Sequence, residues 1–66
     1  MPKTFEELAI MIAKRDGISY EEGLRAVRDC MSELEFALVD GDIDEAEEIL
    51  KDHLGLEPDF LDVFIL

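Results

Sequence analysis

The chain is poor in the residues that cross-link a fold or bind metal ions. Among its 66 residues are 1 Cys, 1 His, 2 Pro and no Trp. A single cysteine excludes an intramolecular disulfide and a cysteine-based zinc site, and the histidine has no second His or Cys at ligand spacing. A chain of this length lies near the lower limit for folding without such cross-links. Its stability must therefore come from apolar packing and well-formed helix ends.

Long hydrophobic runs are also missing. The apolar stretch 8–13 is six residues long and follows two glutamates, which is not typical of a secretory signal. No segment approaches the roughly 20 apolar residues that a membrane span needs. Hydrophobic residues still make up 48% of the chain, which argues against intrinsic disorder. We expect one folded domain over residues 1–66, in the cytoplasm and away from membranes.

Positive charge is scarce, and the negative charge is unevenly placed. The chain has 6 basic and 18 acidic residues, for a net charge of −12. Residues 1–19 are balanced, residues 20–40 carry −4 and residues 41–66 carry −8. Such a field repels nucleic acid and anionic membranes, and it attracts basic protein surfaces over about 8 Å at physiological salt. We expect a protein partner with a basic surface and no direct binding of nucleic acid.

Capping residues and apolar periodicity predict an all-α fold. Thr4, Ser19 and Asp42 each stand three positions before a glutamate, the pattern of a capping box. Pro58 suits the first turn of a further helix, because the N–H that proline lacks has no partner there. The expected helices cover residues 5–15, 20–39, 43–54 and 58–65.

The two central helices are expected to form an antiparallel hairpin, because Asp40 and Gly41 leave almost no loop between them. The 20–39 helix has an apolar stripe whose residues recur at alternating intervals of three and four, which keeps them on one face. This predicts a small three- to four-helix domain in which the stripe packs on its neighbours and a short C-terminal helix closes one end. The stripe consists of Leu24, Val27, Met31, Leu34 and Leu38.

Two apolar groups fit this core poorly. Phe36 and Val39 project about 120° or more away from the centre of the stripe, at 100° per residue. The terminus from Phe60 to Leu66 is apolar on nearly all sides. One interpretation is that the C-terminal helix folds back over Phe36 and Val39. The other is that these groups form a homo-oligomer interface or fill a groove on another protein.

No arrangement of residues predicts catalysis or metal binding. Residues 40–44 resemble the start of a calcium-binding loop, but Glu45 stands where the loop needs glycine and Lys51 where it needs a bidentate glutamate. Cys30 lies beside the stripe, and nearby acids such as Glu33 raise a thiol pKa, which disfavours a nucleophile. Carboxylates on open helix faces lack the pocket that general acid–base work requires. We expect no enzyme activity and no cofactor.

Two resemblances accompany this pattern. Residues 41–58 resemble the second half of a tetratricopeptide repeat, with Gly-Asp-x-x-Glu-Ala, an apolar residue four positions later and a proline after the helix. A single repeat cannot bury its own face, so we interpret this as a shared form of helical hairpin. Through its length, its acidic hairpin and the ending 54–61, the chain resembles the short acidic helical proteins of tailed bacteriophages and mobile elements. That resemblance implies control of a host enzyme such as a nuclease, a polymerase or a defence complex.

The acidic helix surfaces suggest the function. Carboxylates on the outer sides of the two hairpin helices would form one broad negative face that imitates the phosphates of duplex DNA, although acids also serve simply to keep a small protein soluble. We predict a non-enzymatic protein-binding module, an inhibitor or regulator that occupies the nucleic-acid-binding surface of a target. The alternative is a structural protein that assembles as a homo-oligomer, such as a homodimer, through its C-terminal helix. The predicted contact residues are Glu33, Asp44, Glu45, Glu48 and Asp52 for charge, with Phe36, Phe60 and Phe64 as apolar anchors.

Overall fold

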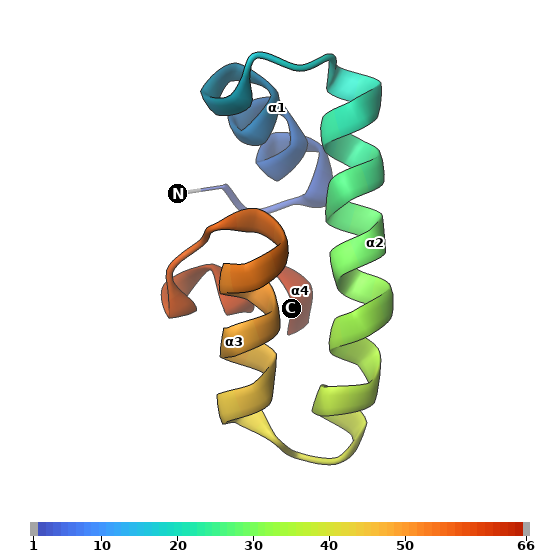
Figure 1. Ribbon diagram of the computed structural model, residues 1–66, viewed down its shortest axis with the longest axis vertical. Helices are drawn as coiled ribbons and strands as arrows, with labels where there is room; N and C mark the ends of the chain where they lie inside the picture. The colour runs from blue at the N-terminus through green and yellow to red at the C-terminus, as the bar shows by residue number, and fades with distance from the viewer. Residues whose placement is uncertain (1, 66) are drawn as a thin grey trace.

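The computed structural model describes residues 2–65 and confirms an all-α fold (Figure 1). Both hairpin helices have the expected bounds, and the first helix runs one residue further than expected. The C-terminal helix is split, because it begins with a 3₁₀ turn and becomes α-helical only in its second half. The elements are α1 (Phe5–Asp16), α2 (Tyr20–Val39), α3 (Ile43–Leu54), η1 (Pro58–Leu61) and α4 (Asp62–Ile65).

The long helix α2 organises the molecule. Helix α1 packs against its N-terminal part, and α3 runs back antiparallel along its C-terminal part, so the predicted hairpin is confirmed (Figure 1). The segment η1–α4 turns back beside α3. The Cα atoms extend over 33 × 19 × 15 Å, and the longest dimension runs along α2 (Figure 1).

Helix ends form as local sequence dictates. The backbone N–H of Glu22 donates to Ser19 Oγ over 3.1 Å, and the N–H of Ser19 donates to Glu22 Oε1 over 3.4 Å, a complete capping box. Thr4 and Asp42 each accept from a backbone N–H three residues later, at 3.1 and 3.0 Å, without the reciprocal bond. Each such cap stabilises the fold by about 1 kcal/mol. The helix bounds were predictable because these interactions are local.

The buried face of α2 lies about one position away from the predicted stripe. Val27 and Leu34 of the predicted stripe are buried, whereas Leu24, Met31 and Leu38 are only half-buried and pack at the edge of the core. The shifted face includes the small residues Gly23, Cys30 and Ala37, and at Gly23 the backbone of α1 comes close. The buried residues of α2 are Gly23, Val27, Cys30, Leu34 and Ala37.

The C-terminal segment packs on its own chain. Leu61 and Phe64 are buried, and the ring centroids of Phe64 and Phe5 are 5.3 Å apart with their planes tilted by 45°. This contact ties the end of the described chain to the start of α1. Phe36 and Val39 remain 76% and 85% exposed, so the expectation that the C-terminal helix covers them is wrong. Phe36 and Val39 lie on the side of α2 opposite the core. The C-terminal segment packs beside α1 and α3 and does not reach that side.

Candidate functional site: an acidic face on α3

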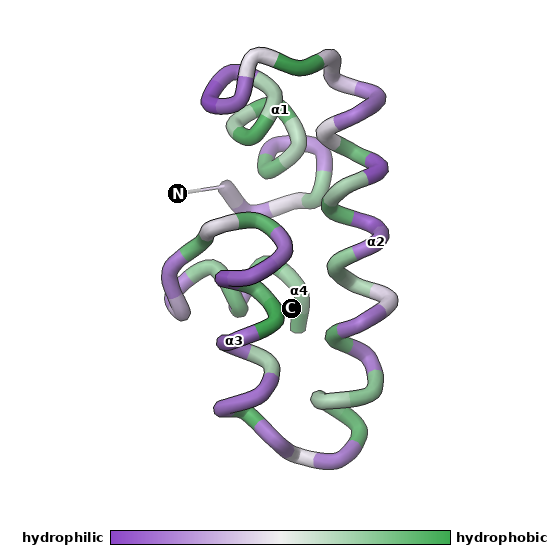
Figure 2. The backbone as a smooth tube through the Cα atoms, in the orientation of Figure 1, coloured by the Kyte–Doolittle hydropathy of each residue, from purple (hydrophilic) through white to green (hydrophobic). Residues whose placement is uncertain are grey.

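Helix α3 presents an apolar side and an acidic side. Its inner side is fixed by three buried residues, Ala46, Leu50 and Leu54. At 100° per residue, four acids fall within a sector of about 100° on the opposite side. Figure 2 shows the same division, with hydrophilic residues on the side of α3 that faces away from α2. We call this surface the α3 acidic face; its residues are Asp44, Glu45, Glu48 and Asp52, and all four are exposed.

The acids of the α3 acidic face form no salt bridge with residues 2–65. Among residues 2–65 the structure contains one salt bridge, between Arg15 Nε and Asp16 Oδ1 at 2.8 Å, and it lies elsewhere. At a rise of about 1.5 Å per residue, the four acids span about 12 Å, or one charge about every 4 Å. One strand of DNA carries a charge about every 3.4 Å. The face can therefore present carboxylates to a basic groove at nearly the spacing of backbone phosphates.

Glu33 does not belong to this helix face. It is exposed, as predicted, but it lies on α2, whereas the α3 acidic face points away from α2. Among the described residues, no side-chain hydrogen bond or salt bridge joins Glu33 to the acids of α3. The structure thus leaves all five predicted acids on the surface and gathers four of them on one helix.

The predicted aromatic anchors have three different fates. Phe36 is 76% exposed, Phe60 is half-buried against the core, and Phe64 is only 6% exposed. Phe64 packs on Phe5 inside the described chain, so its role as an interface anchor stays a prediction that its exposure does not support. Val39, 85% exposed, is a surface residue that the predicted site omitted. The sequence could have indicated this exposure, because Val39 stands three residues after Phe36 and so lies on the same side of α2.

Two kinds of reactive group, a metal-binding cluster and an activated thiol, can be checked in residues 2–65. No group of three or more His, Cys, Asp and Glu residues within 2–65 is placed to hold a metal ion. Burial, and to a lesser extent the nearby Glu33 carboxylate, raises the pKa of Cys30 to about 11, so the thiol is protonated at neutral pH. Such a buried, protonated thiol does not act as a nucleophile. Across the same residues, no helix combines the length and apolar character needed to cross a membrane.

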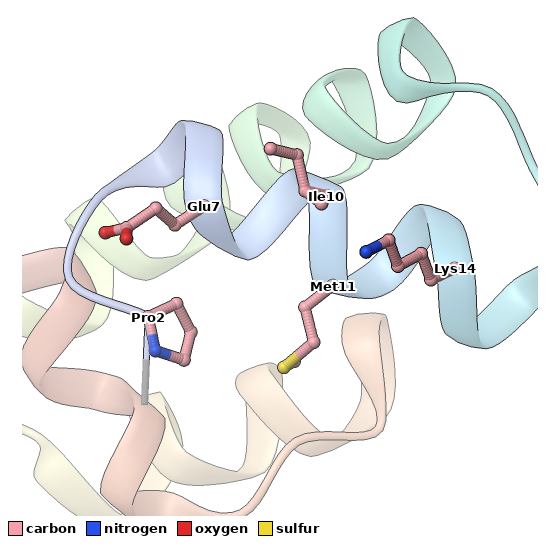
Figure 3. Close-up of a pocket in the computed structure, with 5 residues that line it drawn as sticks. All are labelled: Pro2, Glu7, Ile10, Met11 and Lys14. Carbon is pink, nitrogen blue, oxygen red and sulfur yellow. The ribbon is translucent and has the colours of Figure 1, made fainter.

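An open depression of about 550 Å³ lies between α1 and the residues that precede it (Figure 3). Its polar lining consists of one carboxylate and one ammonium group, which do not form a nucleophile and base. The remaining lining is apolar, so it provides surface and no reactive centre. The lining residues are Pro2, Glu7, Ile10, Met11 and Lys14.

Comparisons with family models, with curated proteins and with solved structures find no match. The resemblances to half a tetratricopeptide repeat and to small phage proteins therefore stay interpretations of the sequence. The function has to be argued from the surface of this chain alone.

Proposed function

We propose that this protein is a non-enzymatic binding module, an inhibitor or regulator whose acidic surface occupies the basic, nucleic-acid-binding surface of a target protein. The observation that carries the proposal is the α3 acidic face, on which four exposed carboxylates have no ion-pair partner in the described chain. The implied targets are host enzymes that act on nucleic acid.

Two physical features support this role. The acids stand on a helix whose inner side is packed against the core, so the backbone that carries them is already ordered before a partner binds. The net charge of −12 should also raise the association rate, because a field of one sign steers an oppositely charged partner toward the protein. The resulting complex should weaken with salt, since exposed charges are screened within about 8 Å at physiological ionic strength.

The first test is a pull-down from host lysate with the tagged protein, eluted with rising salt and identified by mass spectrometry. We expect a nucleic-acid-binding protein that moderate salt releases and that excess duplex DNA displaces. Recovery of only salt-resistant self-complexes, or of a target indifferent to DNA, would contradict the proposal.

Charge reversal then tests the face itself. The triple variant Glu45→Lys, Glu48→Lys, Asp52→Lys should bind the captured target at least tenfold more weakly, because three attractive contacts become repulsive; a tenfold loss corresponds to about 1.4 kcal/mol. Each substitution changes the charge by +2, which takes the net charge from −12 to −6.

The matched control reverses three exposed acids outside α3, namely Glu6, Glu57 and Asp59. It has the same net charge of −6 and should keep most of the affinity. Equal weakening in both triple variants would show that total charge matters and the α3 acidic face does not. Circular dichroism confirms that both variants remain helical.

The alternative, assembly through the C-terminal helix, has less support than the acidic-surface proposal, because Leu61 and Phe64 are buried within the chain.

A further inference from the structure

The side of α2 opposite the core has two halves with different chemistry. Six residues lie within about 40° of the direction that points away from the core, at 100° per residue. The half nearer the N-terminus of the helix carries two arginines, and the other half carries two apolar side chains, with a serine between them. We call this the α2 outer face; its residues are Glu21, Arg25, Arg28, Ser32, Phe36 and Val39, and all six are exposed.

Neither half has a partner within the described chain. Phe36 and Val39 are the two most exposed large apolar residues that the structure describes, at 76% and 85%. Arg25 and Arg28 form no salt bridge there, since the one described pair joins other residues. A shallow depression of about 340 Å³ lies at the arginine half, lined by Glu21, Leu24, Arg25, Arg28 and Asp29.

We propose that the α2 outer face binds a second copy of this chain, with the two α2 helices antiparallel about a twofold axis at Ser32. In this register position 25 of one copy faces position 39 of the other, and position 28 faces position 36. The apolar pair Phe36 and Val39 of each copy then enters the depression around Arg25 and Arg28 of its partner. A surface that meets itself in this way is an isologous interface.

The charges agree with the same register. Arg28 comes beside the partner's Glu35, one position from the facing residue, and Arg25 comes beside the partner's Asp40. Both acids are exposed and flank the apolar half. The Phe36 ring also lies beside a guanidinium, a favourable cation–π arrangement. The basic half of one copy is therefore complementary to the apolar and acidic half of the other.

The charge distribution favours a second copy over a basic partner at this face. The protein carries −12 overall, whereas the α2 outer face together with the flanking Glu35 and Asp40 carries only two positive and three negative charges. Repulsion between copies is therefore weak here, and a basic partner would meet two arginines. The small Ser32 at the axis lets the helices approach closely.

The contact is short, so the dimer should be weak. From position 25 to position 39 the helix is about 21 Å long, and a single pair of helices buries less than the roughly 800 Å² per partner of a standard interface. We expect a dissociation constant of about 100 µM. The inference stands independently of the proposed function, because α3 lies on the other side of α2 and its acidic face stays free in the dimer.

Sedimentation equilibrium tests the dimer directly. Between about 10 µM and about 1 mM protein the mean mass should rise from the protomer mass of 7.5 kDa toward twice that value. Phe36→Asp should remain monomeric, and it should still fold because the residue is exposed. Ile10→Asp, a change of the same kind on exposed α1 surface, should dimerise like the unchanged protein.

Two further variants test the register. Ser32→Cys should form a disulfide between copies under mild oxidation, because it pairs with itself across the axis, whereas Glu48→Cys on the α3 acidic face should not. Arg28→Glu should weaken the dimer about tenfold, and adding Glu35→Arg should restore it. A protein monomeric at the highest concentration, a dimer unaffected by Phe36→Asp, or equal cross-linking of the two cysteine variants would each overturn the proposal.

Discussion

At the scale of single residues, Gly23 decides how closely α1 and α2 approach each other. A Cβ atom at this position would lie 2.7 Å from the carbonyl oxygen of Ala9, which belongs to the backbone and cannot rotate away. Gly23 is buried within α2, and its missing side chain leaves room for α1. The glycine therefore acts as a packing residue, although in a helix interior it is normally a weak point.

Gly23→Ala should destabilise the protein. On an open helix the same change stabilises by about 1 kcal/mol, because alanine has the higher helix propensity. Here we expect a net loss of about 1–3 kcal/mol in the free energy of unfolding, since α1 must move outward to relieve the clash. Urea denaturation measures it, with Ser32→Ala on the exposed side of α2 as the control, expected to change little. A Gly23→Ala variant as stable as the unchanged protein would show that the helices separate freely.

At the scale of elements, the C-terminal segment is part of the core. Its ring at Phe64 packs on Phe5, and so η1–α4 contributes burial that three short helices would otherwise lack. Phe36, the same residue type, contributes none because it faces away from the core. Comparing substitutions at Phe64 and Phe36 therefore measures how much the C-terminal segment contributes to the free energy of unfolding.

Phe64→Ala should cost about 3–5 kcal/mol of unfolding free energy, a large share of the stability of a small domain. Phe36→Ala should change it by about 0.5 kcal/mol or less, as expected at an exposed position. Both are measured by chemical denaturation at low protein concentration, where the proposed dimer is dissociated. Similar losses for the two variants would mean that the C-terminal segment does not hold the position described.

Local features of this fold could be predicted from the sequence, and long-range packing could not. Helix bounds could be predicted because caps such as Ser19 and Asp42 act within a few residues. The exposure of the α3 acids followed from their spacing against Ala46 and Leu50. The destination of the C-terminal segment could not be predicted, because it depends on which of two apolar surfaces offers better packing. The inward position of Gly23, Cys30 and Ala37 on α2 was not predicted, because an apolar stripe is traced through large side chains and these residues are small.

At the scale of the whole molecule, charge opposes folding. The 18 acids and 6 basic residues form a single salt bridge among residues 2–65, and the Cα atoms extend over only 33 × 19 × 15 Å. At about 0.01 M salt the Debye length is about 30 Å, so charges interact across the whole molecule, and the excess of acidic over basic residues makes the net interaction repulsive. Unfolding relieves this repulsion by spreading the charges apart.

Salt should therefore stabilise the protein. Raising sodium chloride from about 10 mM to about 0.5 M shortens the Debye length to below about 5 Å, and we expect the melting temperature to rise by several degrees, given about 4–8 °C per kcal/mol for a domain this small. The double variant Glu48→Lys, Asp52→Lys has a net charge of −8, because each substitution adds +2, and it should melt higher at low salt and gain less from added salt. Thermal melts followed by circular dichroism compare the two. If salt raises the melting temperature equally in both proteins, charge repulsion is not the cause. The rise would then come from stronger apolar burial, which salt also produces.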